Sequence, residues 1–430
     1  MVGVPTRPDL EQQRAARAWC LYDWANSAFA TSVVAAILPP FFAGVAGGSL
    51  APHVATAWWG YASAAAMLLS AVTGAMLGAA SDRLGRRKPM LLILVCVGAV
   101  ATAMMAFIPA GGWRVLLLLY LLGFVPWASA NVLYDSMLPA VAPPDRMHRV
   151  SARGFAYGYL GGGLLLALNL AWILMPRRFG LPDADAAVRL SFVSVGAWWL
   201  LFTIPLLRRV PEPGATADAV PPLRLAASVV RQIADTLATA RRRPELFRFL
   251  IAFWLYSDGI GTIVRMATIY GSEIGIGRND LIGTLLLVQI LAAPASLVFG
   301  RLAQRIGART AVVVGLMGYV GITLFGYFVS RPIHFWILGV MVALFQGGTQ
   351  SLSRSLFVSL APRRQLGELF GFYSLSEKLA GIIGPLLFGL VAQLGGSSRL
   401  AIFALLPLFL GGAWLLLTVD FGRGAERARE

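Results

Sequence analysis

Residues 78–88 read Gly78-Ala-Ala-Ser-Asp82-Arg83-Leu84-Gly85-Arg86-Arg87-Lys88, with the apolar runs 56–80 and 89–109 on either side. A helix of about 20 apolar residues crosses the ~30 Å hydrocarbon core of a bilayer. The basic stretch therefore reads as a short loop between two membrane-spanning helices. Across the whole chain 58% of the residues are hydrophobic and only 13% are charged. Soluble domains carry about 25% charged residues, so the composition excludes a water-soluble fold.

The remaining apolar runs extend this pattern to the whole chain. They predict twelve spans, near 16–43, 56–80, 89–109, 114–138, 153–175, 190–207, 246–271, 281–300, 311–329, 333–358, 367–394 and 399–418. The proline-rich and more hydrophilic residues 208–243 separate the first six spans from the last six. We therefore expect an all-α integral membrane fold with two six-helix bundles, 1–209 and 244–430. A cytoplasmic linker, 210–243, joins them.

The linker and the charges indicate how the chain lies in a membrane. Apolar residues at three- and four-residue steps over 223–237 predict an interfacial helix, although an ordinary solvated connector is the alternative. Of the 36 basic residues, about 26 lie in segments on one side of the membrane and about seven on the other, which explains the net charge of +16. Both termini are then cytoplasmic. The basic clusters lack the interleaved aromatic residues of single-strand binders, so no nucleic-acid partner is expected.

Several stretches of the first half recur in the second half. Trp19-Cys-Leu-Tyr-Asp23 is echoed by Trp254-Leu-Tyr-Ser-Asp258, Gly78–Arg87 by Gly300–Arg309, and Gly154-Phe-Ala-Tyr157 by Gly371-Phe-Tyr373. Each pair occupies an equivalent place in its half. A parallel repeat of six-helix units about an axis along the membrane normal is the arrangement of major facilitator transporters.

The loop 78–88 resembles the signature loop of that superfamily between its second and third helices. The resemblance implies a cytoplasmic gate in which fixed ion pairs hold one half against the other. Its residues are Gly78, Asp82, Arg83, Gly85, Arg86 and Arg87, with Asp135 as the acid expected to meet Arg86, and Arg305 and Arg309 in the second copy. Gln304 and Ala308 replace an acid and an arginine there, so the second latch should be weaker. Alternatively, these charges only orient the chain in the membrane.

A narrower resemblance lies in Leu21–Ala28, in Arg153–Gly163 and in Tyr256-Ser-Asp-Gly259. These segments are similar to the vacuole effluxer family, which comprises the autophagy-related vacuolar amino-acid exporters and their bacterial relatives. The pieces Ile269–Gly271, Gln350–Ser355 and Gly384–Gly389 extend the similarity into the second half. The resemblance covers nearly the whole chain. It implies amino-acid export for the fungal members and leaves the substrate of the bacterial members open.

Charged residues within the spans are the candidates for substrate or proton binding, because each costs about 2.5–3.5 kcal/mol to insert. Asp23 and Asp258 form a symmetric pair in the first and seventh spans, which line the central cavity in this superfamily. They could carry protons or bind a substrate ammonium. The alternative is that each acid is paired permanently with an arginine.

Further polar candidates give the predicted cavity both signs of charge. They are Arg265, Arg354, Glu377 and Lys378, with the uncharged Asn26 and Gln350. A zwitterion or an anion suits such a cavity. Alternatively, Lys378 pairs with an acid such as Asp23, and Arg354 belongs to the cytoplasmic gate. The glycines at 154, 158 and 162 are spaced to let two helix backbones approach closely.

Other functional classes lack the residues they would need. The three histidines lie far apart in the sequence, and no metal or nucleophile motif is present, so we expect neither an enzyme nor a metal or cofactor. The absence of a Walker loop leaves a gradient as the driving force. The sequence thus predicts a secondary transporter that moves amino acids or similar zwitterions by efflux or exchange, with proton coupling plausible.

Two alternatives remain, namely a translocator of a larger amphipathic or anionic molecule, such as a lysolipid or cell-wall fragment, and a non-transporting receptor on the same fold. The expected partners are a small-molecule substrate and membrane lipid, and the expected state is a monomer. Since 34 of the 36 basic residues are Arg, we infer a GC-rich bacterial source. The expected location is the bacterial plasma membrane, which is the inner membrane in a Gram-negative cell.

Overall fold

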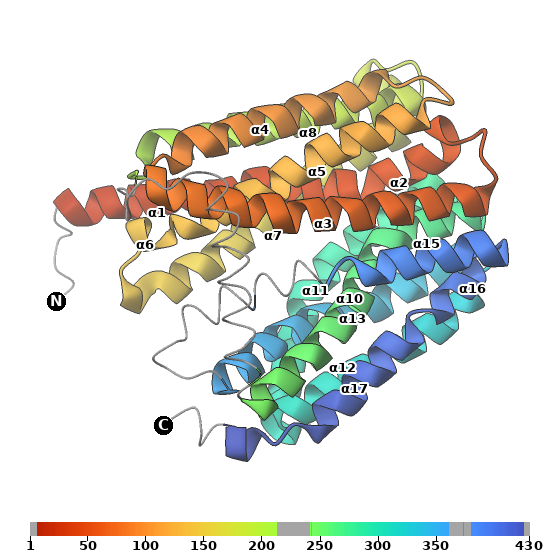
Figure 1. The fold of residues 1–430 in the computed structure, drawn as a ribbon. Helices are drawn as coiled ribbons and strands as arrows, with labels where there is room; N and C mark the ends of the chain where they lie inside the picture. The colour runs from red at the N-terminus through yellow and green to blue at the C-terminus, as the bar shows by residue number, and fades with distance from the viewer. Residues whose placement is uncertain (1–6, 213–240, 242, 361–372, 374–379, 425–430) are drawn as a thin grey trace. The chain divides into compact units, whose positions relative to one another are not determined.

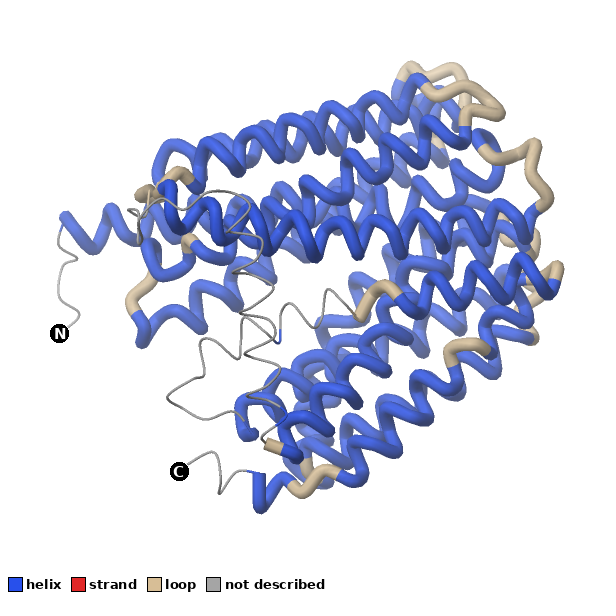
Figure 2. Tube along the Cα trace, viewed as in Figure 1, coloured by secondary structure: helices blue, strands red, loops and turns tan. Residues whose placement is uncertain are grey.

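The computed structural model describes residues 7–212, 241, 243–360, 373 and 380–424. Every regular element in this part of the chain is a helix, and no strand occurs in it (Figure 1, Figure 2). Backbone N–H and C=O groups find no water in hydrocarbon, so apolar runs of this length satisfy them within helices. The predicted all-α membrane fold is confirmed. The linker segment 213–240, with its predicted interfacial helix, lies outside the described residues.

The first six spans have these bounds. The first is continuous through α1 (Arg7–Ala28), the π-helical η1 (Phe29–Ile37), α2 (Leu38–Phe41) and the π-helical η2 (Phe42–Ala46). It is followed by α3 (Pro52–Leu84), α4 (Arg87–Met104) with η3 (Met105–Phe107), α5 (Trp113–Ser136), the short α6 (Leu138–Val141), α7 (Pro144–Leu174), η4 (Pro176–Phe179) and α8 (Ala184–Arg209).

The second set of helices begins after the linker. It consists of α10 (Pro244–Glu273), α11 (Arg278–Ile306), α12 (Ala308–Tyr327), α13 (Pro332–Leu360), α15 (Ile383–Gly395), α16 (Ser398–Phe403) and α17 (Leu406–Thr418). Helix α11 bends by 42° between Ala292 and Pro294. A proline removes one backbone hydrogen bond and clashes with the preceding turn, which accounts for a bend at this place.

Ten described helical segments are long and apolar enough to cross a membrane, and the bent α11 makes an eleventh. They coincide with eleven of the twelve predicted spans. The remaining span was expected over 367–394, and within the described residues it is represented by α15, an apolar helix of 13 residues. The glycines Gly85 and Gly307, which end α3 and α11, have φ angles of 59° and 83°. Only glycine adopts such angles without strain.

Packing divides the chain into two compact units, Met1–Phe41 with Leu69–Val229 and Phe42–Leu68 with Val230–Glu430. In the first unit α1 packs along α7 and α8, and α4 packs along α5 and α8 (Figure 1). A Cβ on Gly158 would lie 2.5 Å from Ser27 Oγ, and one on Gly162 would lie 3.0 Å from the Ser27 carbonyl. The close approach of two helix backbones predicted for this glycine series is thereby confirmed.

In the second unit α13 packs against α11 and α12, while α17 packs against α10 and α12. The segment Phe42–Leu68, which includes the first half of α3, is part of this unit although its flanking residues belong to the other unit. Large apolar side chains such as Ile93, Leu160 and Trp414 are exposed on the described helices. In a chain of this composition such residues face lipid.

Candidate substrate and gate sites

One face of α10 holds an acid, a hydroxyl and a base. Asp258, Thr262 and Arg265 occur at positions i, i+4 and i+7 of the helix, so all three lie on the same side. Asp258 is only 2% exposed. The Thr262 hydroxyl donates to the Asp258 backbone carbonyl at 2.7 Å, which keeps this hydroxyl along the helix axis. The structure therefore groups two of the predicted binding residues, Asp258 and Arg265, on one helix face.

The Asp258 carboxylate lies at the N-terminus of α15. Its Oδ2 accepts a hydrogen bond from the backbone N–H of Gly384 at 2.7 Å, and Gly384 is the second residue of that helix. A helix N-terminus presents free N–H groups and a positive dipole end, both of which favour an anion. The Ile383 backbone N–H also acts on this carboxylate. Its second oxygen, Oδ1, is buried and makes no hydrogen bond of good geometry to a described residue, so one oxygen is held more firmly than the other.

Arg265 extends back along α10 towards Asp258. A Cβ on Gly261 would lie 2.8 Å from Arg265 Nη2, which places the guanidinium over the preceding turn of the helix. The same nitrogen donates to the Gly381 carbonyl at 3.4 Å. Its positive charge acts on the Asp258 carboxylate. Carboxylate and guanidinium therefore face a common region, the arrangement expected for a group that carries both charges.

In the first unit, two hydrogen bonds between side chains join α1 to α5. The Tyr134 hydroxyl donates to Asp23 Oδ2 at 2.7 Å, and Asn26 Nδ2 donates to Asn131 Oδ1 at 2.9 Å. Both helices contribute residues three positions apart, so the two bonds follow one line of contact. The indole of Trp127 donates to the Asn26 carbonyl at 3.1 Å. Asp23 and Asn26, both predicted binding residues, are thus positioned by α5.

The two acids have related surroundings. A Cβ on Gly154 of α7 would collide with Asp23 Oδ2, and a Cβ on Gly384 would lie 2.9 Å from Asp258 Oδ1. Helix α7 and the described α15 occupy the fifth span of their respective halves. Each acid of the first span of a half therefore lies against a glycine of its fifth span. This agrees with the internal repeat that the sequence indicates.

The predicted cytoplasmic gate begins where α3 ends. Gly78 packs against α5, since a Cβ there would lie 3.2 Å from Val132, and Gly85 makes the turn into α4. Arg86 and Asp135 are exposed, and Arg87 is buried. The side chains of Asp82 and Arg83 lie outside the described part, and the pairing of Arg86 with Asp135 stays a prediction.

The same loop is tied to the end of α8 by a residue that the prediction did not include. Lys88 Nζ donates to the Val210 carbonyl at 2.9 Å, and the Lys88 backbone N–H donates to the Glu212 carboxylate at 3.1 Å. Glu212 thus caps the N-terminus of α4. The sequence around Glu212, between Pro211 and Pro213, does not predict that it caps α4, because the contact joins residues far apart in the sequence.

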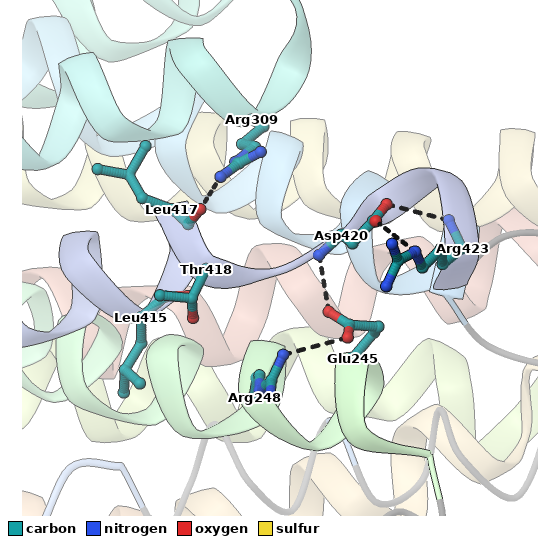
Figure 3. A network of polar contacts seen from close by, with 8 residues as sticks. All are labelled: Glu245, Arg248, Arg309, Leu415, Leu417, Thr418, Asp420 and Arg423. Carbon is teal, nitrogen blue, oxygen red and sulfur yellow. Dashed lines mark hydrogen bonds and ion pairs between the residues drawn. The ribbon is translucent and has the colours of Figure 1, made fainter.

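The second copy of the loop makes an equivalent connection. Figure 3 shows Arg309, at the start of α12, donating to the Leu417 carbonyl near the end of α17. Arg305 is exposed. In the same view Glu245 accepts from the Asp420 backbone N–H at 2.7 Å and pairs with Arg248 at 3.2 Å. In both halves a basic residue at the start of the third span therefore donates to the backbone at the end of the sixth.

The other predicted binding residues lie on α13 or outside the described residues. Gln350 and Arg354 lie one turn apart on α13, and both are exposed. Glu377 and Lys378 lie outside the described residues. No group of three or more metal-ligating side chains occurs in the described part of the chain. Sequence reasoning also missed Glu273, which lies at the very end of α10, where an acid in an apolar run is easily taken for a helix terminus.

Comparison with known proteins identifies relatives over almost the entire chain. A family model described as "Vacuole effluxer Atg22 like" matches residues 54–429. The MFS-type transporter YxiO of Bacillus subtilis is 40% identical over 403 residues, which cover 93% of this chain and 94% of that protein. Autophagy-related protein 22 of Kluyveromyces lactis is 25% identical over 374 residues, covering 80% of this chain and 75% of its own.

Solved structures share the fold. The nucleoside transporter NupG superposes with a TM-score of 0.70 at 13% sequence identity, over 95% of this chain and 99% of that one. An identity this low shows the fold alone, which is that of the major facilitator transporters.

Proposed function

This chain belongs to the vacuole effluxer Atg22-like family and is a multi-pass transporter of the major facilitator type, and from this premise we propose that it exports or exchanges amino acids or similar small zwitterions. It works by alternating access in a bacterial plasma membrane, with both termini cytoplasmic. A Bacillus relative that matches nearly end to end supports this location, and the family description supports the direction, efflux.

The observation that supports the substrate class is the pairing of charges on α10. Asp258 presents a buried oxygen that makes no hydrogen bond of good geometry to a described residue, and Arg265 lies seven residues further along the same face, about 10 Å of helix rise. The guanidinium leans back over Gly261 and shortens this separation. A small zwitterion bound there would place its ammonium on the carboxylate and its carboxylate on the guanidinium.

The two acids differ in the donors that they meet, and this difference assigns them separate roles. A backbone N–H can only donate, so the Gly384 contact favours the ionised form of Asp258, which would bind the substrate ammonium. A phenol can donate to a carboxylate and accept from a carboxylic acid, so Tyr134 serves Asp23 in either protonation state. We therefore assign the coupled proton to Asp23.

Counterflow into proteoliposomes tests the substrate class. Vesicles preloaded with one unlabelled amino acid are expected to accumulate the labelled form, and Asp258→Asn and Arg265→Gln are expected to lower the initial rate at least about tenfold. Glu11→Gln and Arg177→Gln are matched controls, because both residues are exposed outside the charged face of α10. Specific binding of lysolipids or cell-wall fragments, with no amino acid accumulated, would contradict the proposal and favour an amphipathic substrate.

A further inference from the structure

The segment Phe42–Leu68 is joined to α10 and α15 by contacts at several points along its length. The Trp59 indole donates to the Arg265 carbonyl at 3.1 Å, and the Tyr61 hydroxyl donates to the Gln393 side chain. A Cβ on Gly60 would lie 2.6 Å from the Pro385 carbonyl, so α3 and α15 touch through their backbones. All these contacts lie within the second compact unit.

The outermost of these contacts centres on a single carboxylate. Glu273, the last residue of α10, accepts from the Thr56 hydroxyl at 2.5 Å and from the Ser398 backbone N–H at 3.0 Å. It also accepts from the Ser398 hydroxyl. Thr56 and Ser398 are both fully buried. Three donors from the start of α3 and the start of α16 therefore converge on one acid.

This carboxylate lies beyond the candidate substrate site on the same helix. Glu273 is eight residues after Arg265, about 12 Å of helix rise, and lies at the end of α10 opposite Arg248. Trp59 is fully buried, with its ring centroid 5.9 Å from that of Phe42, and binds the backbone of Arg265 directly. The packed segment therefore covers the substrate site from the end of the second unit that lies away from the basic loops.

We infer that Glu273 is a gate latch on the side of the membrane opposite the basic loops. Its carboxylate ties Phe42–Leu68 to α10 and α16 and closes that route to Arg265. Opening on that side separates Glu273 from Thr56, while the Ser398 contacts hold the carboxylate within the second half. The inference rests on the alternating-access part of the proposed function. It identifies Glu273, with its donors Thr56 and Ser398, as a closing contact outside the substrate site, and it assigns this contact to the side of the membrane opposite the basic loops.

A cysteine reporter behind the latch tests this inference without any substrate. Met67 is 8% exposed and contacts the position that a Cβ on Gly381 would take, about 16 Å of helix from Thr56. The chain has only two cysteines, which are removed as Cys20→Ser and Cys96→Ala, and Met67→Cys is introduced. A membrane-impermeant maleimide is then added to sealed vesicles of each orientation, and the labelling rate is measured.

Glu273→Ala is expected to raise labelling from the side opposite the basic loops about tenfold and to lower it from the basic side. Thr56→Val removes one donor and keeps the side-chain shape, so a smaller shift in the same direction is expected. Glu245→Gln, at the other end of α10, is the matched control and should not raise labelling from the latch side. Unchanged rates in both latch variants, or a parallel rise on both sides, would overturn the inference. Failure of counterflow alone would overturn only the proposed substrate class.

Discussion

Gly384 packs so closely against the buried Asp258 that no larger side chain fits at its position. Gly384→Ala would place a methyl group 2.9 Å from Asp258 Oδ1 and into the Thr262 hydroxyl. Overpacking of this kind costs about 1–3 kcal/mol, so we expect a lower melting temperature in detergent and slower counterflow. Gly163→Ala is the control, because its Cβ would meet nothing within 4 Å. A variant at 384 as stable and active as the control would contradict the described packing.

Tyr134 donates a hydrogen bond to Asp23 at 2.7 Å. Tyr134→Phe removes that hydroxyl and leaves the ring stacked on Trp19. Hydrogen bonds to charged groups contribute about 1.5–3 kcal/mol to the free energy of unfolding. We therefore expect Tyr134→Phe to lower the melting temperature. Tyr159→Phe, with a side chain 53% exposed, should leave it unchanged. Equal melting temperatures for the two variants would show that the Asp23 contact is energetically unimportant.

Sequence reasoning found both acids but not their partners. Asp23 and Asp258 are recognisable because charge in an apolar run is costly, which holds whatever the fold. Tyr134 lies 111 residues from Asp23, and Gly384 lies 126 residues from Asp258. No local pattern specifies such pairs. The different roles assigned to the two acids therefore depend on contacts that only the folded chain provides.

Among the helices, α4 depends on a cap from another part of the chain. The Glu212 carboxylate accepts from the Lys88 backbone N–H at 3.1 Å. Glu212→Ala should destabilise the protein by about 0.5–2 kcal/mol, as loss of other helix caps does. Thermal melting with Glu11→Ala as a control measures this, since Glu11 is exposed. A loss no larger than that of the control would mean that Glu212 does not stabilise α4.

Helix positions were predicted better than helix shapes. Eleven of the twelve expected spans coincide with helical segments, because the thickness of hydrocarbon sets their length. The π-helical turns at Phe29–Ile37 and Phe42–Ala46 were not expected. Nor was the 42° bend of α11, although Pro294 was visible in the sequence. Hydropathy reports the length of an apolar run and does not encode such local changes of the hydrogen-bond pattern.

For the molecule as a whole, the roles of the two acids predict different transport defects. Exchange of one substrate molecule for another moves no net proton across the membrane. Export driven by a pH gradient, in contrast, requires a proton to cross the membrane in each cycle. Asp23→Asn cannot release a proton, so it should keep counterflow and lose pH-driven transport. Asp258→Asn should lose both. Measuring the two activities in the same proteoliposomes tests the assignment, and a loss of counterflow in Asp23→Asn would show that Asp23 also binds substrate.

The internal repeat is where sequence and structure agree most fully. The echoed segments predicted two related halves, and contacts in both halves follow the same plan. Lys88 donates to the Val210 carbonyl at 2.9 Å, and Arg309 donates to that of Leu417. The packing nevertheless departs from a simple division of the chain at the linker. Phe42–Leu68 precedes the linker but packs with the second compact unit.

The sequence by itself determined the membrane class, the helical architecture, the repeat and the family, because each follows from run length, composition or local motif. Hydrocarbon imposes those constraints on any chain. Only the tertiary structure decided which donor meets Asp23, which helix meets Asp258, and that Glu273 accepts hydrogen bonds from Thr56 and Ser398. Hydrogen bonds between distant residues depend on how the helices pack, and polar groups within a bilayer must find such partners inside the protein.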